Sequence, residues 1–260
     1  MKNFLIAVAT ITLLILSTNV QSQTRRVTGS KKYITKDVKV ANFNEIRLMG
    51  SPDIVYTQTN GKTEVQVYGS DNIVDLLEIA VIKEVLVVKF KSNTQINNSG
   101  KLEVRVSNPG LKSISVQGSG DIKLANNFKS KENLGIYIQG SGDVEGSGVN
   151  CNELSLSIQG SGDISLHGVS SPSVKASIEG SGDVELSGTA KEANYRVAGS
   201  GDINATELKV SNADIQINGS GDIGCQVTDN MKVRVNGSGE VSYKGNPQID
   251  SPRNKGLRKL

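Results

Sequence analysis

The sequence predicts an all-β protein, a parallel β-helix or β-solenoid with coils of about 20 residues and irregular coils in its N-terminal part. Three observations predict this fold class: a repeated tetrapeptide, strict alternation of apolar residues around it, and a repeat unit too short to bury its own apolar face. Gly-Ser-Gly-Asp begins at Gly118, Gly140, Gly160, Gly180, Gly199 and Gly219, and Gly-Ser-Gly-Glu begins at Gly237. The steps between these glycines are 22, 20, 20, 19, 20 and 18 residues, which is the spacing of a structural repeat.

The alternation predicts a strand on each side of every tetrapeptide. Counted from its first glycine, apolar side chains recur at positions −6, −4, −2, +4 and +6. Position −2 holds Val116, Ile138, Ile158, Ile178, Val197, Ile217 and Val235, and position +4 holds Ile122, Val144, Ile164, Val184, Ile203, Ile223 and Val241. A period of two with β-branched residues is typical of strands with one buried face. Because the even positions continue through the tetrapeptide, its two glycines face inward and its serine and acid face outward.

The first 22 residues have the features of a secretory signal peptide, in which Lys2 precedes an apolar run from Phe4 to Leu16. Residues 23–37 follow as an N-terminal extension. The signal predicts export to the periplasm, the outer surface or the extracellular space, with an uncleaved anchor as the alternative. No later stretch reaches the roughly 20 apolar residues of a membrane helix, so we expect no transmembrane segment in the mature chain.

We expect degenerate β coils in residues 38–117 and the regular repeat in residues 118–245. Residues 246–260 are expected to form a C-terminal cap with a basic tail. Two places in the degenerate part keep the pattern of apolar residues around a glycine, namely Gly50-Ser51-Pro52-Asp53 and Gly69-Ser70. We therefore expect one continuous domain from about residue 38 onward.

Four local features vary the degenerate coils. Asn60-Gly61 predicts a tight turn, and Asp71 to Ile79 a short helical insertion. Val81 to Phe90 predicts a buried strand pair, and Asn93 to Gly100 a polar loop. Lys83-Glu84-Val85 stands where we would expect a turn with glycine, so the geometry of that strand pair is left open.

The outward serines and acids of the repeat are the candidate contact surface, called here the serine–acid surface. Its members are Ser119, Asp121, Ser141, Asp143, Ser161, Asp163, Ser181, Asp183, Ser200, Asp202, Ser220, Asp222, Ser238 and Glu240. Adjacent carboxylates about 5 Å apart repel by roughly 1 kcal/mol per pair in water. Backbone N–H groups of the turn, bound cations or hydration would offset this repulsion; turn chemistry is the favoured interpretation, and no metal site is assigned.

Other function classes have little support in the sequence. The formal net charge of +3 falls by one with the loss of Lys2, so no nucleic-acid partner is predicted, and no cofactor is predicted either. His167 is the only histidine and is expected to be an ordinary surface residue. A carbohydrate-active β-helix enzyme needs acids or bases in unlike environments, and the chain offers regular columns instead.

The two cysteines are expected to be free thiols. Cys225 lies at position +6, where other coils carry leucine, so it is expected in the core. Cys151 lies four coils away, about 19 Å along the solenoid axis at the usual strand spacing. A disulfide requires Cα atoms within about 7 Å of each other.

The segments "VANFNEIRLMGSPDIVYTQ", "VQVYGSDNIVDLLEI", "VRVSNPGLKSISVQGSGDI" and "VSYKGNP" occur in this order along the chain. With them the chain resembles the putative auto-transporter adhesin, head GIN domain family of secreted bacterial proteins, over nearly the whole mature chain. The resemblance implies a β-helix similar in outline to pectin lyases, without known catalytic residues, and a role in cell-surface adhesion.

We therefore expect a non-enzymatic, extracytoplasmic β-solenoid that acts as an adhesin or cell-envelope interaction protein. Its surface ligand, protein or glycan, is unknown. The alternatives are a carbohydrate-active enzyme and a structural module stiffened by calcium on the acid column. A homo-oligomer is a further alternative, because the ends of a solenoid expose unpaired strands.

Overall fold

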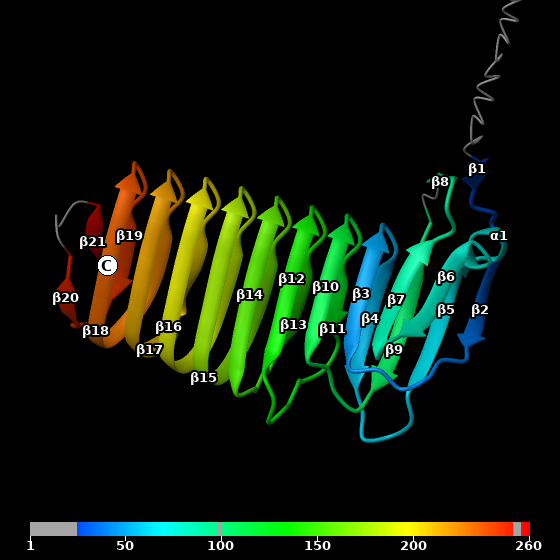
Figure 1. The fold of residues 1–260 in the computed structure, drawn as a ribbon, viewed down its shortest axis with the longest axis horizontal. Coiled ribbons are helices and arrows are strands. Elements are labelled where there is room, and N and C mark those ends of the chain that lie inside the picture. The colour runs from blue at the N-terminus through cyan, green and yellow to red at the C-terminus, as the bar shows by residue number, and fades with distance from the viewer. Residues whose placement is uncertain (1–24, 98–99, 252–255) are drawn as a thin grey trace, which may run out of the picture.

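The computed structural model describes residues 25–97, 100–251 and 256–260, so the predicted signal peptide lies outside the described residues. Within these residues the chain forms 21 strands and one short helix, α1 (Asp71–Val74) (Figure 1). They build a β-solenoid of about 7 turns with roughly 20-residue coils, which confirms the predicted fold class.

The regular repeat forms ten strands that pair in parallel from coil to coil. They are β10 (Ser113–Gly118), β11 (Ile122–Leu124), β12 (Leu134–Gly140), β13 (Val144–Ser147), β14 (Glu153–Gly160), β15 (Ile164–Gly180), β16 (Val184–Gly199), β17 (Ile203–Gly219), β18 (Ile223–Gly237) and β19 (Val241–Lys244). The tetrapeptide turns line the upper edge of the solenoid in Figure 1. Each of the four strands β15, β16, β17 and β18 runs without interruption from one tetrapeptide turn to the next.

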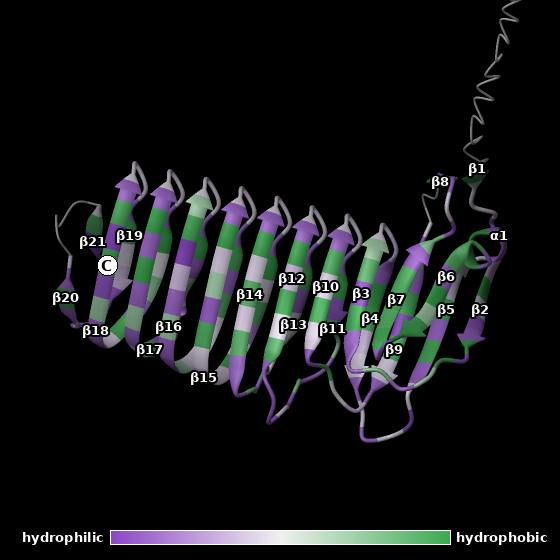
Figure 2. Cartoon of the chain, viewed as in Figure 1, coloured by the Kyte–Doolittle hydropathy of each residue, from purple (hydrophilic) through white to green (hydrophobic). Residues whose placement is uncertain are grey.

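The predicted inward columns form the core, and the alternation appears as bands along the strands in Figure 2. Every residue at positions −2 and +4 of the repeat is at most 2% exposed, except Val235 in the last coil, which is partly buried. Each such side chain contributes about 1.5–3 kcal/mol when fully buried. Stacked valine and isoleucine therefore hold each coil against the next.

A coil from the degenerate part of the sequence continues this stack. β3 (Glu45–Gly50) and β4 (Asp53–Gln58) pair in parallel with β10 and β11, so the predicted coil around Gly50 is confirmed. On its other side lie β7 (Val85–Phe90), paired with β3, and β9 (Glu103–Asn108), paired with β4. The chain thus leaves this coil after β4, returns on its far side, and then crosses it to reach β10.

Antiparallel strands close the N-terminal end of the solenoid (Figure 1). β5 (Glu64–Ser70) pairs antiparallel with β9 and with β2 (Tyr33–Val38), and β6 (Leu77–Ile82) pairs antiparallel with β7. β1 (Arg25–Thr28) pairs in parallel with β8 (Thr94–Asn97) beside this end. Both β1 and β2 include residues of the predicted N-terminal extension.

Three predictions for this region need correction. The segment around Gly69 is not a parallel coil, because β5 runs antiparallel to both of its neighbours. The helical insertion ends at Val74 instead of Ile79, because the chain after it forms β6 along β7. The predicted polar loop from Asn93 to Gly100 contains β8, which pairs with the N-terminal strand β1.

The strand pair predicted from Val81 to Phe90 is the hairpin of β6 and β7. Its turn residues Lys83 and Glu84 have φ of 49° and 64°, both in the left-handed region. Two successive residues there form the turn that suits the twist of a hairpin, although glycine or asparagine is usual. Burial is one-sided, because Leu86 of β7 is fully buried whereas Ile82 of β6 is 59% exposed.

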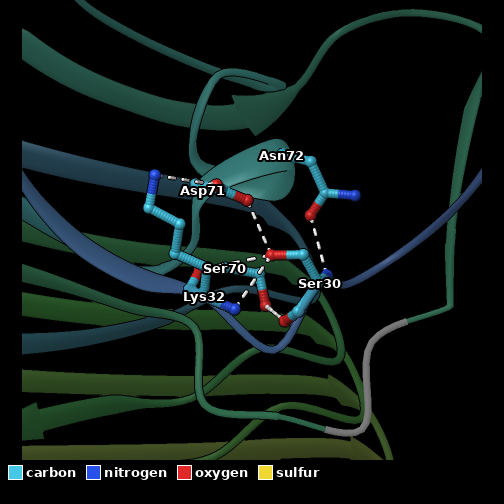
Figure 3. Close-up of polar contacts among 5 residues, drawn as sticks. All are labelled: Ser30, Lys32, Ser70, Asp71 and Asn72. Atoms are coloured by element: carbon cyan, nitrogen blue, oxygen red, sulfur yellow. Dashed lines mark hydrogen bonds and ion pairs between the residues drawn. The ribbon is translucent and has the colours of Figure 1, made fainter.

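A polar cluster ties the turn between β1 and β2 to α1 (Figure 3). Ser30 Oγ donates to Asp71 Oδ1 at 2.6 Å, and the Ser30 backbone N–H donates to Asn72 Oδ1 at 2.9 Å. Ser70 Oγ donates to the Ser30 carbonyl oxygen at 2.8 Å, and Lys32 Nζ lies 3.7 Å from Asp71 Oδ2. The hydrogen bond from Ser30 is the main cause that holds the pKa of Asp71 below its usual value.

Aromatic stacking adds a second tie across β2, β5 and β9. The Tyr33 and Tyr68 rings stack with centroids 5.6 Å apart, and the Arg105 guanidinium lies 5.3 Å from the Tyr68 centroid. An exposed cation–π contact contributes about 0.5–1 kcal/mol. Side-chain contacts therefore support the antiparallel end, where the stacked columns of the repeat are missing.

The predicted C-terminal cap adds two short strands to the last coil. β20 (Gln248–Asp250) pairs with β18, and β21 (Leu257–Lys259) pairs with β19. Arg258 Nε donates to Glu240 Oε1 at 2.5 Å, which attaches β21 to the last acid of the repeat.

Candidate functional site

The glycines of the tetrapeptide are required by the stacking of the turns. The first glycine of each repeat has φ between 137° and 152°. A Cβ on Gly160 would lie 2.2 Å from the carbonyl oxygen of Gly140, and one on Gly162 would lie 2.1 Å from that of Gly142. Only a residue without a side chain fits there, so the glycines are structural.

The aspartates form a hydrogen-bonded column along these turns. The backbone N–H of each acid donates to Oδ1 of the aspartate in the preceding coil, as from Asp163 to Asp143 and from Asp183 to Asp163, both at 2.8 Å. The column starts at Asp53 and ends where the Glu240 N–H reaches Asp222 Oδ1 at 2.7 Å. Backbone N–H groups thus offset part of the carboxylate repulsion, as the favoured interpretation expected.

The first member of this column differs from the others in its surroundings. Partial burial is the main cause that raises the pKa of Asp53, and the hydrogen bond from the Asp121 backbone opposes that rise. Nearby Glu103 raises the pKa further, and Lys101 lowers it. Asp53 is thus the member of the column that lies next to β9, the strand that pairs with the antiparallel end.

The orientation expected for the serine–acid surface is found at every position. All seven serines and six aspartates of this surface are exposed, and Glu240 is half-buried beside Arg258. The solenoid brings them together as parallel columns along one edge, although they span residues 119–240 of the sequence. Their role in contacting a ligand stays a prediction.

A second feature, here called the polar groove, was not predicted from the sequence. It has a volume of about 640 Å³ and crosses the strands near the C-terminal end. Its two walls and its floor are columns of residues paired from strand to strand. One wall is Ser173, Glu192, Asn212, Asn230 and Gln248; the other is Lys175, Asn194, Asp214, Lys232 and Asp250; the floor is Ala193, Ala213, Met231 and Ile249.

The floor residues of the groove occupy the inward position −6 of the repeat, so the side chains that border the groove are those of its two walls. The same inward position is Leu134, Leu154 and Val174 in the preceding coils, and all three are fully buried. In the next two coils it is Ala193 and Ala213, each 6% exposed. Asparagines at the outward positions −7 and −5, namely Asn194, Asn212 and Asn230, are the sequence signal that would have indicated polar walls here.

Hydrogen bonds along one wall connect adjacent coils. Asn230 Nδ2 donates to Asn212 Oδ1 at 2.8 Å, and Asn212 Nδ2 donates to Glu192 Oε1 at 3.0 Å. On the other wall Lys232 Nζ lies 3.9 Å from Asp214 Oδ2. Lys175 Nζ donates to Glu153 Oε2 at 2.8 Å just outside the groove, and this bond is the main cause that lowers the pKa of Glu153.

His167 lies on the exposed face, as expected. Its Nε2 lies 3.2 Å from Ser165 Oγ, and its Nδ1 lies 3.4 Å from Ser187 Oγ. The neighbouring hollow of about 240 Å³ also includes Lys123 and Glu145, which pair with each other. Both ring nitrogens thus contact serine hydroxyls, and no carboxylate in the described chain orients the ring.

Both cysteines are buried as free thiols, and the core position expected for Cys225 is confirmed. Burial raises the pKa of Cys225 to about 12 and also raises the pKa of Cys151. Burial likewise raises the pKa of Tyr195, whose hydroxyl is buried without a hydrogen-bond partner among the described residues. Thiols held protonated in this way are poor nucleophiles.

The described residues contain no group of three or more histidine, cysteine, aspartate or glutamate side chains placed to hold a metal ion. Of the helices in the described ranges, none is long and apolar enough to span a membrane.

Three solved structures resemble this fold over most of their length. A putative lipid binding protein from Parabacteroides distasonis ATCC 8503 is 27% identical, with a TM-score of 0.80 over 91% of this chain and 100% of that chain. A putative adhesin from Parabacteroides merdae ATCC 43184 is 25% identical, with a TM-score of 0.82 over 90% and 96%. A putative adhesin from Bacteroides fragilis NCTC 9343 is 33% identical, with a TM-score of 0.67 over 90% and 95%.

No curated protein matches the sequence. A family match, in contrast, covers residues 42–247, which include the first parallel coil, the antiparallel strands β5 and β6 and the whole regular repeat. The chain therefore belongs to the family described as "Putative auto-transporter adhesin, head GIN domain".

Proposed function

We propose that this protein is an exported, non-enzymatic adhesion module that binds a ligand on a cell surface or in the cell envelope. The observation that carries the proposal is the serine–acid surface, in which equal side chains stand exposed at the same register in successive coils. Successive strands are about 4.8 Å apart, so a ligand with a regular structure meets several equivalent contacts. The adhesin family to which the chain belongs supports the same function.

Binding of the labelled mature chain, residues 23–260, to epithelial cells and to bacterial envelope fractions tests this proposal. Two triple variants separate the contributions of the surface: Asp143→Asn, Asp163→Asn and Asp183→Asn in one, and Ser141→Ala, Ser161→Ala and Ser181→Ala in the other. The asparagine Oδ1 still accepts the backbone N–H of the next coil, so the first variant removes charge and keeps the turn.

We expect each triple variant to keep the circular dichroism of the parent and to bind several-fold less. Full binding by both variants would exclude the serine–acid surface as the contact face. A parent protein that binds none of these surfaces would contradict the adhesion function itself.

A further inference from the structure

The polar groove is a depression in the face of the sheet, and none of its lining residues belongs to the serine–acid surface. It extends across five adjacent strands, from Ser173 to Gln248, a distance of roughly 19 Å at the usual strand spacing. The groove runs across the strands, so a long ligand would lie along the solenoid axis and contact one strand after another.

Charges in the groove nearly balance. Two ammonium groups, of Lys175 and Lys232, and three carboxylates, of Glu192, Asp214 and Asp250, line the groove. Lys175 is engaged by Glu153 and Lys232 lies near Asp214, so neither is an isolated cation. A polyanion would gain little here and would meet the three carboxylates, which favours an uncharged ligand.

Amide side chains dominate the hydrogen-bonding capacity of the walls. Asn194, Asn212, Asn230 and Gln248 each carry both donors and acceptors. A hydroxyl group also donates and accepts, so a ligand rich in hydroxyls can pair with every one of these amides. On the floor the side chains of Ala193, Ala213 and Met231 are at most 6% exposed, whereas Ile249 at the C-terminal end of the groove is 39% exposed and offers an apolar contact for one face of a sugar ring.

Two other ligand classes fit less well. An extended peptide that binds by β-addition needs free backbone N–H and C=O groups at a sheet edge. The central strands of the groove, β16 and β17, are paired on both sides, so their backbone groups are already used. An acyl chain would lie between two polar walls and desolvate them without replacing their hydrogen bonds.

From these features we propose that the polar groove binds a linear, uncharged glycan laid across the coils. The proposal rests on the adhesion function proposed above, for which it supplies a second contact site and a ligand class. Recognition depends on side chains of successive coils, so affinity rises with the length of the oligosaccharide until the groove is filled.

Calorimetric titration of the mature chain with neutral oligosaccharides of increasing length, derived from mannan, xylan and cellulose, tests the proposal. The groove variant is Asn194→Ala with Asn212→Ala. Its matched control is Asn218→Ala with Asn236→Ala, which removes two asparagines that are hydrogen-bonded to each other on β17 and β18, outside the groove. We expect saturable binding that is weakened roughly 10-fold or more in the groove variant and unchanged in the control.

Oligogalacturonate and phosphatidylglycerol vesicles serve as the acidic and lipid probes. The proposal is overturned if either binds in place of the neutral oligosaccharides, if none of these oligosaccharides binds at millimolar concentration, or if both variants bind equally. A parent chain that adheres to cells but ignores every oligosaccharide refutes only the groove. A chain that binds oligosaccharides through the groove but adheres to no surface refutes only the adhesion function.

Discussion

The regular repeat and the N-terminal region use the same strands and turns but are assembled in different ways. In residues 118–245 each coil after the first lies beside the coils that precede and follow it in the sequence. In the N-terminal region the coil of β3 and β4 lies between two pairs of strands that both come later in the chain. The regular part is stabilised by identical contacts, and the N-terminal part by contacts that occur once.

The largest expected effect concerns the stacked glycines. Gly160→Ala should destabilise the protein by more than about 3 kcal/mol, because the new Cβ combines a left-handed backbone with a clash against Gly140. At the equivalent position of the N-terminal coil, Gly50 has φ of 104° but its nearest neighbour would be 3.8 Å from the Cβ. Gly50→Ala should therefore cost only about 1–2 kcal/mol.

Urea denaturation followed by circular dichroism measures both variants. A midpoint for Gly160→Ala equal to that for Gly50→Ala would show that the stacked turns of the repeat are no tighter than the first coil.

A smaller effect is expected from the aspartate column. Asp163→Ala removes the acceptor for the Asp183 N–H, so the free energy of unfolding should fall by about 1 kcal/mol. Asp163→Asn keeps an acceptor oxygen and should change stability by less than half as much. If the two substitutions are equally destabilising in thermal denaturation, the charge of the column matters and its hydrogen bond does not.

Acid should loosen the N-terminal region first. The pKa of Asp71 is lower in the folded protein than in the unfolded chain, so the stability it provides is present above the unfolded pKa of about 4. That stability is lost as the pH falls through the lower, folded pKa. The hydrogen-exchange protection factors of residues 25–38, in which the pH dependence of intrinsic exchange is corrected for, should therefore fall in this range before those of the repeat.

The variant Asp71→Asn is the control for this experiment, because it cannot titrate. Its protection factors in residues 25–38 should be lower at neutral pH and should fall less as the pH falls. An equal fall in protection in variant and parent would assign the acid sensitivity to another group.

The smallest effect is expected from calcium. One oxygen of each aspartate in the column already accepts a backbone N–H, so added calcium should leave the thermal midpoint unchanged relative to a chelator. A rise of several degrees would instead make the column an ion site and favour the calcium-dependent alternative.

The same comparison explains which features could be predicted from the sequence. In the repeat, coils that follow each other in the sequence are also neighbours in space. The inward columns and the exposure of Ser161 and Asp163 therefore follow from a period of two. Around Gly69 the same alternation belongs to an antiparallel strand. Alternation of apolar residues predicts which face of a strand is buried but does not predict which strand it pairs with or in which direction. The walls of the polar groove are polar residues at outward positions, which the period of two does not distinguish from the rest of the exposed face.

The aspartate column has a consequence for how such a protein changes over evolutionary time. Each unit supplies one acceptor to the next unit and one donor to the previous one, so a duplicated unit of about 20 residues brings its own complete set of bonds. Duplication or deletion within the repeat therefore alters the length of the rod in steps of about 4.8 Å. Reach can thus be adjusted in whole units while both specialised ends of the molecule are inherited unchanged.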